Sequence, residues 1–386
     1  MFNVVLAILL SVLAGMSWYL SQRLHQGLAA LFPGMRLWPV LVIISAVVLL
    51  MVLGFSRAFL PLSGDVKHVL GVVSAYCMGF CLYLLLFTAA ADLLFLIPRL
   101  LKLPFTLHRL FKGGLSLGVL LLTLATCAYG FFNAQQIDHV SYDVRLQEGK
   151  KDISAMHVVM ISDLHLGAVG SEGRLEKIVD EINALKPDLV CIAGDFFDTD
   201  FSSIQDPAAA LRTLQKLHAT HGTYACLGNH DAGSTHDQMT AFLKQANIRL
   251  LRDAYTVVGD QLVLVGRLDG TPIGGYGGEK RKALSEIFTR EDPALPVIVL
   301  DHNPANIHEY TDEADLILCG HTHKGQVFPG NLITKRMYSV DYGYYQKDAQ
   351  SPHVIVTSGV GAWGMPMRVG TDCEIVTIRF TSADSP

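Results

Sequence analysis

The sequence predicts an α/β protein that is preceded by a region of membrane-spanning helices. Hydrophobic residues make up 51% of the 386 residues and charged residues only 17%, and almost all of the apolar excess lies before residue 134. Such a balance is unusual for a wholly water-exposed chain. After residue 134, several short apolar runs end abruptly in polar residues. Residues 189–193, for example, are followed by Asp195 and Asp198. This run is too short for an ordinary helix and is typical of a strand buried on both faces.

Four apolar segments are predicted to cross a membrane, because each approaches the roughly 20 residues that a spanning helix needs. The first segment opens the chain. No basic residue precedes it and no Ala-x-Ala site closes it, so we interpret it as a span and not as a cleaved signal peptide. The predicted spans are residues 2–20, 38–55, 69–89 and 115–132.

Asp92 follows the third predicted span, and a carboxylate is costly at the middle of a bilayer. We therefore predict that this span ends near residue 89 and that Asp92 opens an amphipathic helix at the membrane interface. A proton or ion site at Asp92 is the alternative. The interfacial segment would carry the basic residues Arg99, Lys102, Arg109 and Lys112.

The basic residues of the connections predict an orientation. The first and third connections together carry six, which are Arg23, Arg36 and the four just named; the second connection and the segment after the last span carry five, which are Arg57, Lys67, Arg145, Lys150 and Lys151. The positive-inside rule then places the two termini outside the cytoplasm. The opposite orientation, with the second half of the chain in the cytoplasm, stays open.

The region after the spans begins with a β-α-β pattern. Residues 134–152 are polar and are predicted to form a juxtamembrane linker with a strand at residues 140–146, and residues 153–382 are predicted to form the folded domain. Residues 157–161 form an apolar run, residues 175–185 have apolar positions at helical spacing, and the 189–193 run follows. The two strands of such a unit are parallel, so their polar ends lie on the same edge of a sheet.

Five apolar runs of this kind end in residues that can bind metal ions. The donors are Asp163 and His165 after the first run, Asp195 after the second, Asn229 and His230 after residues 223–227, His302 after residues 297–300, and His321 and His323 after residues 316–319. A single histidine at such a place is usually a structural residue, but five such endings in one chain indicate a metal centre. The mixture of imidazole, carboxylate and amide oxygen suits Mn, Fe or Zn better than calcium. The set exceeds the needs of one tetrahedral ion, which favours two ions that share a carboxylate.

The motif order D-x-H, G-D, G-N-H-D, H and G-H-x-H resembles the calcineurin-like metallophosphoesterase superfamily, and within it the bacterial membrane-anchored phosphoesterases similar to YkuE and YaeI. The resemblance covers about residues 155–380. It implies two stacked mixed β-sheets flanked by helices, a four-layer sandwich. It also implies one ion held by Asp163, His165, Asp195 and His323, and a second held by Asp195, Asn229, His302 and His321. His230 matches the catalytic histidine of the family, with Asp231 as its orienting partner.

This centre predicts a membrane-tethered phosphohydrolase of the bacterial inner membrane, either a phosphodiesterase or a pyrophosphatase. Two divalent ions can clamp a phosphoryl group and lower the pKa of a bridging water, and the hydroxide then attacks phosphorus. His230 would donate a proton to the leaving group or stabilise charge on the equatorial phosphoryl oxygens. The substrate is a phosphoester, for which membrane attachment makes a lipid-linked or cell-envelope compound one option.

Two other classes of function stay open at this stage. One is a catalytically silent, metal-binding membrane scaffold or sensor; the other is a transporter with an attached phosphoesterase domain, for which Asp92 would be the intramembrane charge. The net charge of −5 and the lack of a nucleic-acid-binding motif predict no nucleic-acid partner.

Four further residues are predicted to assist the metal centre. Asp198 would accept a hydrogen bond from a metal-binding histidine, and the predicted contacts for phosphate are Arg267, Lys324 and Arg368.

Overall fold

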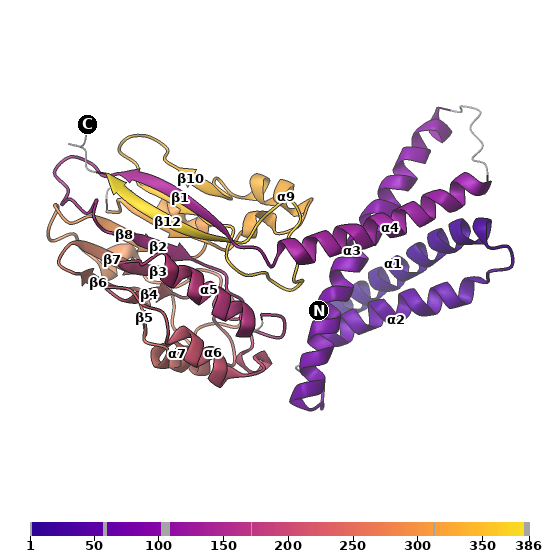
Figure 1. Cartoon of the computed structure of the whole chain (residues 1–386), viewed down its shortest axis with the longest axis horizontal. Helices are drawn as coiled ribbons and strands as arrows, with labels where there is room; N and C mark the ends of the chain where they lie inside the picture. The colour runs from indigo at the N-terminus through magenta and orange to yellow at the C-terminus, as the bar shows by residue number, and fades with distance from the viewer. Residues whose placement is uncertain (1, 57–59, 102–108, 171, 312, 382–386) are drawn as a thin grey trace. The chain divides into compact units, whose positions relative to one another are not determined.

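The structure of the chain, a computed structural model, describes residues 2–56, 60–101, 109–170, 172–311 and 313–381. It divides into two compact units, Met1–Phe131 and Phe132–Pro386 (Figure 1). Arg57 and Lys102, which enter the predicted orientation, and residue 382, the predicted end of the folded domain, lie outside the described residues.

The first unit consists of helices. These are α1 Phe2–Leu31, α2 Leu37–Phe55, α3 Gly64–Leu100 and α4 Arg109–Asn133. Three stretches among the described residues are long and apolar enough to cross a membrane: Leu37–Phe55, Gly64–Leu96 and Phe111–Asn133. They contain the predicted spans 38–55, 69–89 and 115–132. The first predicted span, residues 2–20, is helical as part of α1, but α1 is not among the three stretches that meet both criteria.

Asp92 does not open a new helix, because α3 continues without a break to Leu100; where the third span ends stays a prediction. Asp92 therefore lies inside this long helix. Its carboxylate is 2.7 Å from Nε of Arg23 and accepts a hydrogen bond of 2.7 Å from the hydroxyl of Tyr19, both on α1. Because these partners offset the charge of Asp92, a continuous helix can contain this carboxylate.

The second unit contains two six-stranded sheets (Figure 1). The first has the order β1-β12-β2-β3-β4-β5, with β1 Asp138–Arg145, β12 Glu374–Thr381, β2 Val158–Ile161, β3 Leu189–Ala193, β4 Thr223–Cys226 and β5 Ile248–Leu250. The second has the order β10-β11-β9-β8-β7-β6, with β10 Gly343–Tyr345, β11 His353–Val356, β9 Leu316–Cys319, β8 Val297–Leu300, β7 Leu262–Gly266 and β6 Ala254–Val258. Both sheets are mixed: β12 runs antiparallel to β2, β10 to β11 and β6 to β7, and the other neighbours are parallel.

Alternation along the strands explains why the sheets form layers. Successive strand side chains point to opposite faces. In β3, Leu189 and Cys191 pack in the apolar core between the sheets, whereas Val190 and Ile192 pack in a second core beneath the helices α5 Glu172–Ala184, α6 Pro207–Leu214 and α7 His236–Gln245. Figure 1 shows these three helices along one side of the first sheet. The second sheet has its own outer core, which contains Val299 of β8 and packs against α8 Leu284–Ile287.

The segment 134–152, predicted as a linker with a strand at residues 140–146, contributes this strand to the fold. Eight residues, Asp138–Arg145, form β1, which pairs in parallel with β12 at the edge of the first sheet. Asn133, the last residue of α4, donates a hydrogen bond of 2.9 Å to the carbonyl of Thr371, close to the start of β12. The segment therefore belongs to the second unit, which begins well before residue 153.

Candidate metal centre

The backbone at the ends of β2 and β3 fixes the first donors. The amide of Asp163 donates to the carbonyl of Gly194 at 3.0 Å, and the amide of His165 donates to the carbonyl of Asp195 at 3.1 Å. Asp163, His165 and Asp195 have φ angles of +58°, +47° and +53°. Residues with a side chain rarely adopt this left-handed conformation, so the surrounding structure must hold them there. Strain of this kind is concentrated at functional sites.

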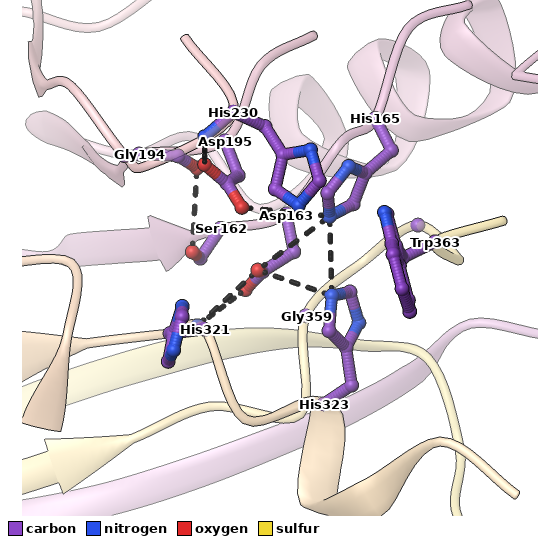
Figure 2. A network of polar contacts seen from close by, with 12 residues as sticks. Ser162, Asp163, His165, Gly194, Asp195, His230, His321, His323, Gly359 and Trp363 are labelled. Atoms are coloured by element: carbon purple, nitrogen blue, oxygen red, sulfur yellow. Dashed lines mark hydrogen bonds and ion pairs between the residues drawn. The ribbon is translucent and has the colours of Figure 1, made fainter. Parts of the chain in front are cut away.

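One group of donors gathers around His165 and His323 (Figure 2). The Nε2 atoms of the two rings are 3.1 Å apart. Oδ1 of Asp163 lies 3.3 Å from Nε2 of His323 and 3.8 Å from Nε2 of His165. All three side chains are buried. Their ligand atoms therefore surround one small volume.

A second group gathers around His302 and His321. Nε2 of His302 is 3.3 Å from Nδ1 of His321, and Oδ1 of Asn229 is 2.8 Å from the same Nδ1 atom. Nδ1 of His302 lies 2.7 Å from the carbonyl of Ala193, to which it donates. Because that bond uses the proton on Nδ1, Nε2 is the ring atom of His302 that faces the other donors.

Asp195 lies between the two groups. Its Oδ2 atom is 3.2 Å from Nε2 of His302 and 3.7 Å from Nε2 of His165. Its Oδ1 atom accepts a hydrogen bond of 2.9 Å from the amide of His230, which fixes the carboxylate. The structure thus brings together all seven donors predicted from the sequence: Asp163, His165, Asp195, Asn229, His302, His321 and His323.

Two glycines allow the carboxylates to approach so closely. A Cβ atom at Gly228 would lie 2.1 Å from Oδ1 of Asp195, and one at Gly359 would lie 2.7 Å from Cβ of Asp163. Gly359 also has a φ angle of +82°. Any larger residue at these positions would displace the acids from the centre.

Burial sets the protonation of the centre. It lowers the pKa of His165 to about 3 and that of His321 to about 4, and it holds the pKa of His323 well below its ordinary value. Burial, together with the neighbouring Asp195, raises the pKa of Asp163 to about 6. Burial alone would raise the pKa of Asp195, but the facing His302 holds it below its ordinary value. At neutral pH the three rings with lowered pKa are neutral and offer lone pairs.

These donors fit divalent metal ions. Ring nitrogens with lone pairs converge beside buried carboxylates, an arrangement that a cation would stabilise and that few direct hydrogen bonds can satisfy. Each group offers both nitrogen and oxygen ligands, as Mn, Fe or Zn would accept. Residues Asp163, His165 and His323 could hold one ion, and Asn229, His302 and His321 another, with Asp195 available to both.

His230 lies at the edge of the centre, with its ring 5.1 Å from that of His165 (Figure 2). Its partner differs from the prediction. Nδ1 of His230 pairs with Oγ1 of Thr199 at 2.6 Å. The carboxylate of Asp231 instead accepts from the amides of Phe197 and Gly228, at 3.0 and 2.9 Å. Asp231 is therefore a buried loop anchor, and Thr199 is the residue that contacts the ring.

The four residues predicted to assist the centre have different positions. A carboxylate oxygen of Asp198 lies within 4.8 Å of ring nitrogens of His165 and His230, but Nδ1 of His165 has no hydrogen-bond partner among the described residues, so the structure does not place Asp198 as its acceptor. Arg267 is fully buried and pairs with Asp253 at 2.9 Å. Its charge is thus already neutralised, and we no longer interpret it as a phosphate contact.

Arg368 is also fully buried, and it supports His323. Its guanidinium donates to the carbonyl of His323 at 3.0 Å and lies 3.2 Å from Nδ1 of the same ring. It therefore holds a donor in place and is not exposed to bind phosphate. Lys324, the other predicted contact, has its ammonium 3.9 Å above the ring of Tyr342.

Sequence reasoning missed three residues near the centre. Thr199 follows the β3 motif without a pattern of its own. Trp363, 47% exposed, has its ring 5.7 Å from that of His230 (Figure 2). Asp269 is buried and its Oδ2 atom lacks a hydrogen-bond partner among the described residues. The sequence held a signal for Asp269, which follows the apolar run of β7 as the other acids follow their strands.

The second unit combines two mixed sheets with imidazole, carboxylate and amide donors at the ends of parallel strands. Together with the sequence comparisons, this combination defines a metal-dependent phosphoester hydrolase. The profile of calcineurin-like phosphoesterases matches residues 156–325. The chain belongs to this family, which uses divalent metal ions, and the predicted fold of two mixed sheets with flanking helices is confirmed.

Three relatives illustrate the range of the family. The chain is 32% identical over 225 residues to an uncharacterized metallophosphoesterase of Aquifex aeolicus, covering 58% of this chain and 84% of the relative. It is 27% identical over 370 residues to a transmembrane protein with metallophosphoesterase domain of Danio rerio, covering 90% and 81%. It is 28% identical over 264 residues to the UDP-2,3-diacylglucosamine pyrophosphatase LpxG of Chlamydia trachomatis, covering 55% and 79%. A membrane-associated phosphoester hydrolase is thus supported, and the narrower grouping with YkuE and YaeI stays a prediction.

Proposed function

We propose that the chain is a membrane-anchored hydrolase that uses two divalent ions to cleave phosphodiesters or pyrophosphates. The observation that carries this proposal is the position of Asp195. One oxygen of this buried carboxylate faces both donor groups, as a ligand shared by two ions would. Mn, Fe or Zn fits the mixed donors. Ions bound here would supply charge to offset the phosphoryl oxygens and would lower the pKa of water.

The residues of the chain then have separate tasks. His230 lies beside the centre and its Nδ1 atom is held by Thr199, which leaves Nε2 for the substrate. From there it can donate a proton to the leaving oxygen or a hydrogen bond to the phosphoryl group. The amide of His230 donates to the carboxylate of Asp195 and fixes it, and the lack of a side chain at Gly228 leaves room for that carboxylate. Arg368 holds His323 through its carbonyl. The site is therefore preorganised before a substrate binds.

A lipid-linked substrate is the class that we favour. The relative LpxG is named for a pyrophosphate compound that carries acyl groups. In addition, exposed apolar side chains lie on segments next to the centre. Helix α9, Gly330–Met337, packs on the turn His323–Gly325, and its Leu332, Ile333 and Met337 are 57%, 58% and 68% exposed. Trp363 adds an exposed ring beside His230. Such a surface suits acyl chains or the edge of a bilayer.

The position in the membrane is part of the proposal. We propose that α1 forms a fourth span, and that the positive-inside rule places the catalytic unit outside the cytoplasm of a bacterial cell. The relative with a transmembrane description, which covers most of this chain, supports the presence of spans. Protease digestion of the C-terminus in sealed vesicles of known orientation tests the side.

Substitution of the shared carboxylate tests the proposed chemistry. Full-length wild-type protein loaded with Mn is expected to hold two ions per chain and to hydrolyse bis(p-nitrophenyl) phosphate. Asp195→Asn is expected to hold at most one ion and to lose about 10³-fold or more in turnover, because several kcal/mol of charge stabilisation disappear. Asp237→Asn, on the exposed face of α7, is the matched control and should resemble the wild type. Two retained ions with unchanged hydrolysis in Asp195→Asn would refute the two-ion proposal.

A further inference from the structure

The helical unit contains a polar cavity that the hydrolase site does not explain. The cavity has a volume of about 360 Å³ and lies between α1, α3 and α4. Its charged lining residues are Arg23, Asp92 and Lys112. Ionisable residues between membrane helices are costly and usually have a function. The cavity therefore requires an explanation of its own, independent of the metal centre.

The lining carries a surplus positive charge. Asp92 is paired with Arg23 at 2.7 Å and with the Tyr19 hydroxyl at 2.7 Å, so its charge is already balanced. Lys112 is exposed and has no ion-pair partner among the described residues. Two cations and one carboxylate leave a net charge of +1 in the lining. A cavity with this charge suits one monoanionic group.

An unsatisfied hydroxyl gives independent evidence for a ligand. Thr88 of α3 lines the cavity, is 6% exposed, and its Oγ1 atom has no hydrogen-bond partner among the described residues. Buried polar atoms without partners are uncommon, and such a hydroxyl is satisfied when a ligand supplies an acceptor. Close packing forms one wall, because a Cβ at Gly27 would meet Oγ of Ser116 at 1.7 Å.

The depth of the cavity matches the lipid headgroup level. Arg23 and Asp92 each lie about two turns before the C-terminal ends of α1 and α3, and Lys112 lies in the first turn of α4. All three thus lie close to the ends that the first and third connections join. By the predicted orientation that side is cytoplasmic, where anionic lipids concentrate.

We propose that this cavity binds the phosphodiester group of an anionic phospholipid from the surrounding leaflet. Lys112 supplies the charge, the Arg23–Asp92 pair lines the site, and the Thr88 hydroxyl donates to a phosphate oxygen. The site is separate from the metal centre and would hold a lipid as a bound cofactor of the membrane unit.

Native mass spectrometry of the full-length protein in detergent tests the proposal. Phosphatidylglycerol should remain bound in preference to phosphatidylcholine with the same acyl chains. Lys112→Gln should weaken phosphatidylglycerol binding about fivefold, the usual effect of one basic residue near anionic lipid. Asp92→Asn should strengthen the binding of phosphatidylglycerol, because the cavity lining loses its negative charge. Lys67→Gln, near the opposite end of α3, is the matched control and should bind as the wild type does.

The Thr88→Val variant separates a ligand from a purely structural role. If the hydroxyl binds lipid, the isosteric valine should weaken phosphatidylglycerol binding; if it is only a buried, unpaired group, the change should leave binding unaltered and the protein equally or more stable. Inorganic phosphate provides the second arm. Displacement of the lipid by millimolar phosphate would assign the site to a soluble anion and overturn the proposal, as would equal retention of both lipids or unchanged binding in Lys112→Gln.

Discussion

Thr199 shows how a single residue can reveal function through its conformation. It is β-branched, yet its φ angle is +66°, a region that such residues almost never occupy. Its hydroxyl lies 2.6 Å from Nδ1 of His230. Strain of this kind persists only where the surrounding fold enforces it, and it is common at active sites. The conformation and the contact together identify Thr199 as the positioning residue for His230.

Removal of this hydroxyl should slow turnover without loss of metal. Thr199→Val keeps the shape and the β-branch but cannot pair with Nδ1, so the ring loses its anchor. We expect kcat for bis(p-nitrophenyl) phosphate to fall about tenfold, the effect of one lost positioning hydrogen bond, with little change in KM. Thr199→Ser should restore most of the rate. Equal kcat values for all three proteins, measured at matched metal content, would exclude this role.

The residue scale also shows what the sequence could and could not predict. The convergence of the seven predicted donors could be expected, because a donor that follows a buried strand lies at a known edge of a parallel sheet. Thr199 and the true partners of Asp231 were not predictable, because they depend on how loops fold back on one another. The ion pair of Arg267 could not be predicted for the same reason, because its partner, Asp253, is fourteen residues away across the β6–β7 hairpin.

At the scale of elements, the strands were predicted more reliably than the segments between them. Runs such as residues 189–193 must be strands because both faces are buried. The segment 270–282 is rich in glycine, yet Tyr276 within it is 2% exposed and donates to the carbonyl of Gly228. The glycine-rich composition of this segment indicates a flexible backbone but does not predict the hydrogen bond between Tyr276 and Gly228.

Helix α9 should affect acylated substrates selectively. Leu332 and Ile333 are exposed on this short helix next to the centre, and contact with an acyl chain would bury them. We expect Leu332→Asn and Ile333→Asn to lower kcat/KM for p-nitrophenyl hexadecyl phosphate about tenfold each, which corresponds to burial of one apolar side chain. The rate on p-nitrophenyl methyl phosphate should stay unchanged.

A matched control for α9 is Val257→Asn, which alters an exposed apolar residue of β6, at the far edge of the second sheet. It should leave both rates at the wild-type values. An equal loss on the long-chain and short-chain substrates in the α9 variants would show that the helix supports the fold and does not contact acyl chains.

His353 of β11 should make the stability of the second unit depend on pH. Burial lowers the pKa of this ring, whose Nε2 donates to the carbonyl of Arg145 at 2.9 Å and whose Nδ1 pairs with the Tyr344 hydroxyl at 2.7 Å. In the unfolded chain the pKa is about 6.5. As pH falls below that value, His353 becomes protonated in the unfolded state but stays neutral in the folded state. The free energy of unfolding is therefore highest above about pH 6.5 and decreases below it.

Thermal unfolding between pH 7.5 and 5.5 measures this effect. The unfolding temperature of the wild type should fall more over this interval than that of His353→Gln, which keeps a donor for Arg145 but does not titrate. The loss amounts to at most about 1.4 kcal/mol per pH unit. His308→Gln, at an exposed position, should follow the wild type. Parallel pH curves for wild type and His353→Gln would contradict the prediction.

On the scale of the whole molecule, two different solvents shape the two units. Continuous apolar runs made three membrane-compatible helices predictable, since the bilayer leaves no alternative to a helix that satisfies its own backbone. The second unit follows the alternation of a water-exposed fold, in which polar residues gather at strand ends. In the sequence between the two regions, the strand predicted at residues 140–146 forms as β1, which is polar at several positions and is held as a strand by its pairing with β12.

Removal of metal should destabilise the second unit while the helices of the first stay folded. Asp163 and Asp195 are at most 2% exposed and face the same volume. A bound cation stabilises the folded state by about 2.7 kcal/mol at a hundredfold excess over Kd, and for a unit of this size each kcal/mol shifts Tm by about 2–4 °C. Chelation should therefore lower the Tm of the metal-loaded protein by about 5–10 °C, and added Mn should restore it. The helical circular dichroism of the first unit should persist through that transition.

Asp195→Asn should show a smaller shift of Tm on chelation than Asp237→Asn, because the shared ligand is gone. Equal Tm values with and without chelator would mean that these buried acids are stabilised by the protein alone and that the centre does not depend on ions.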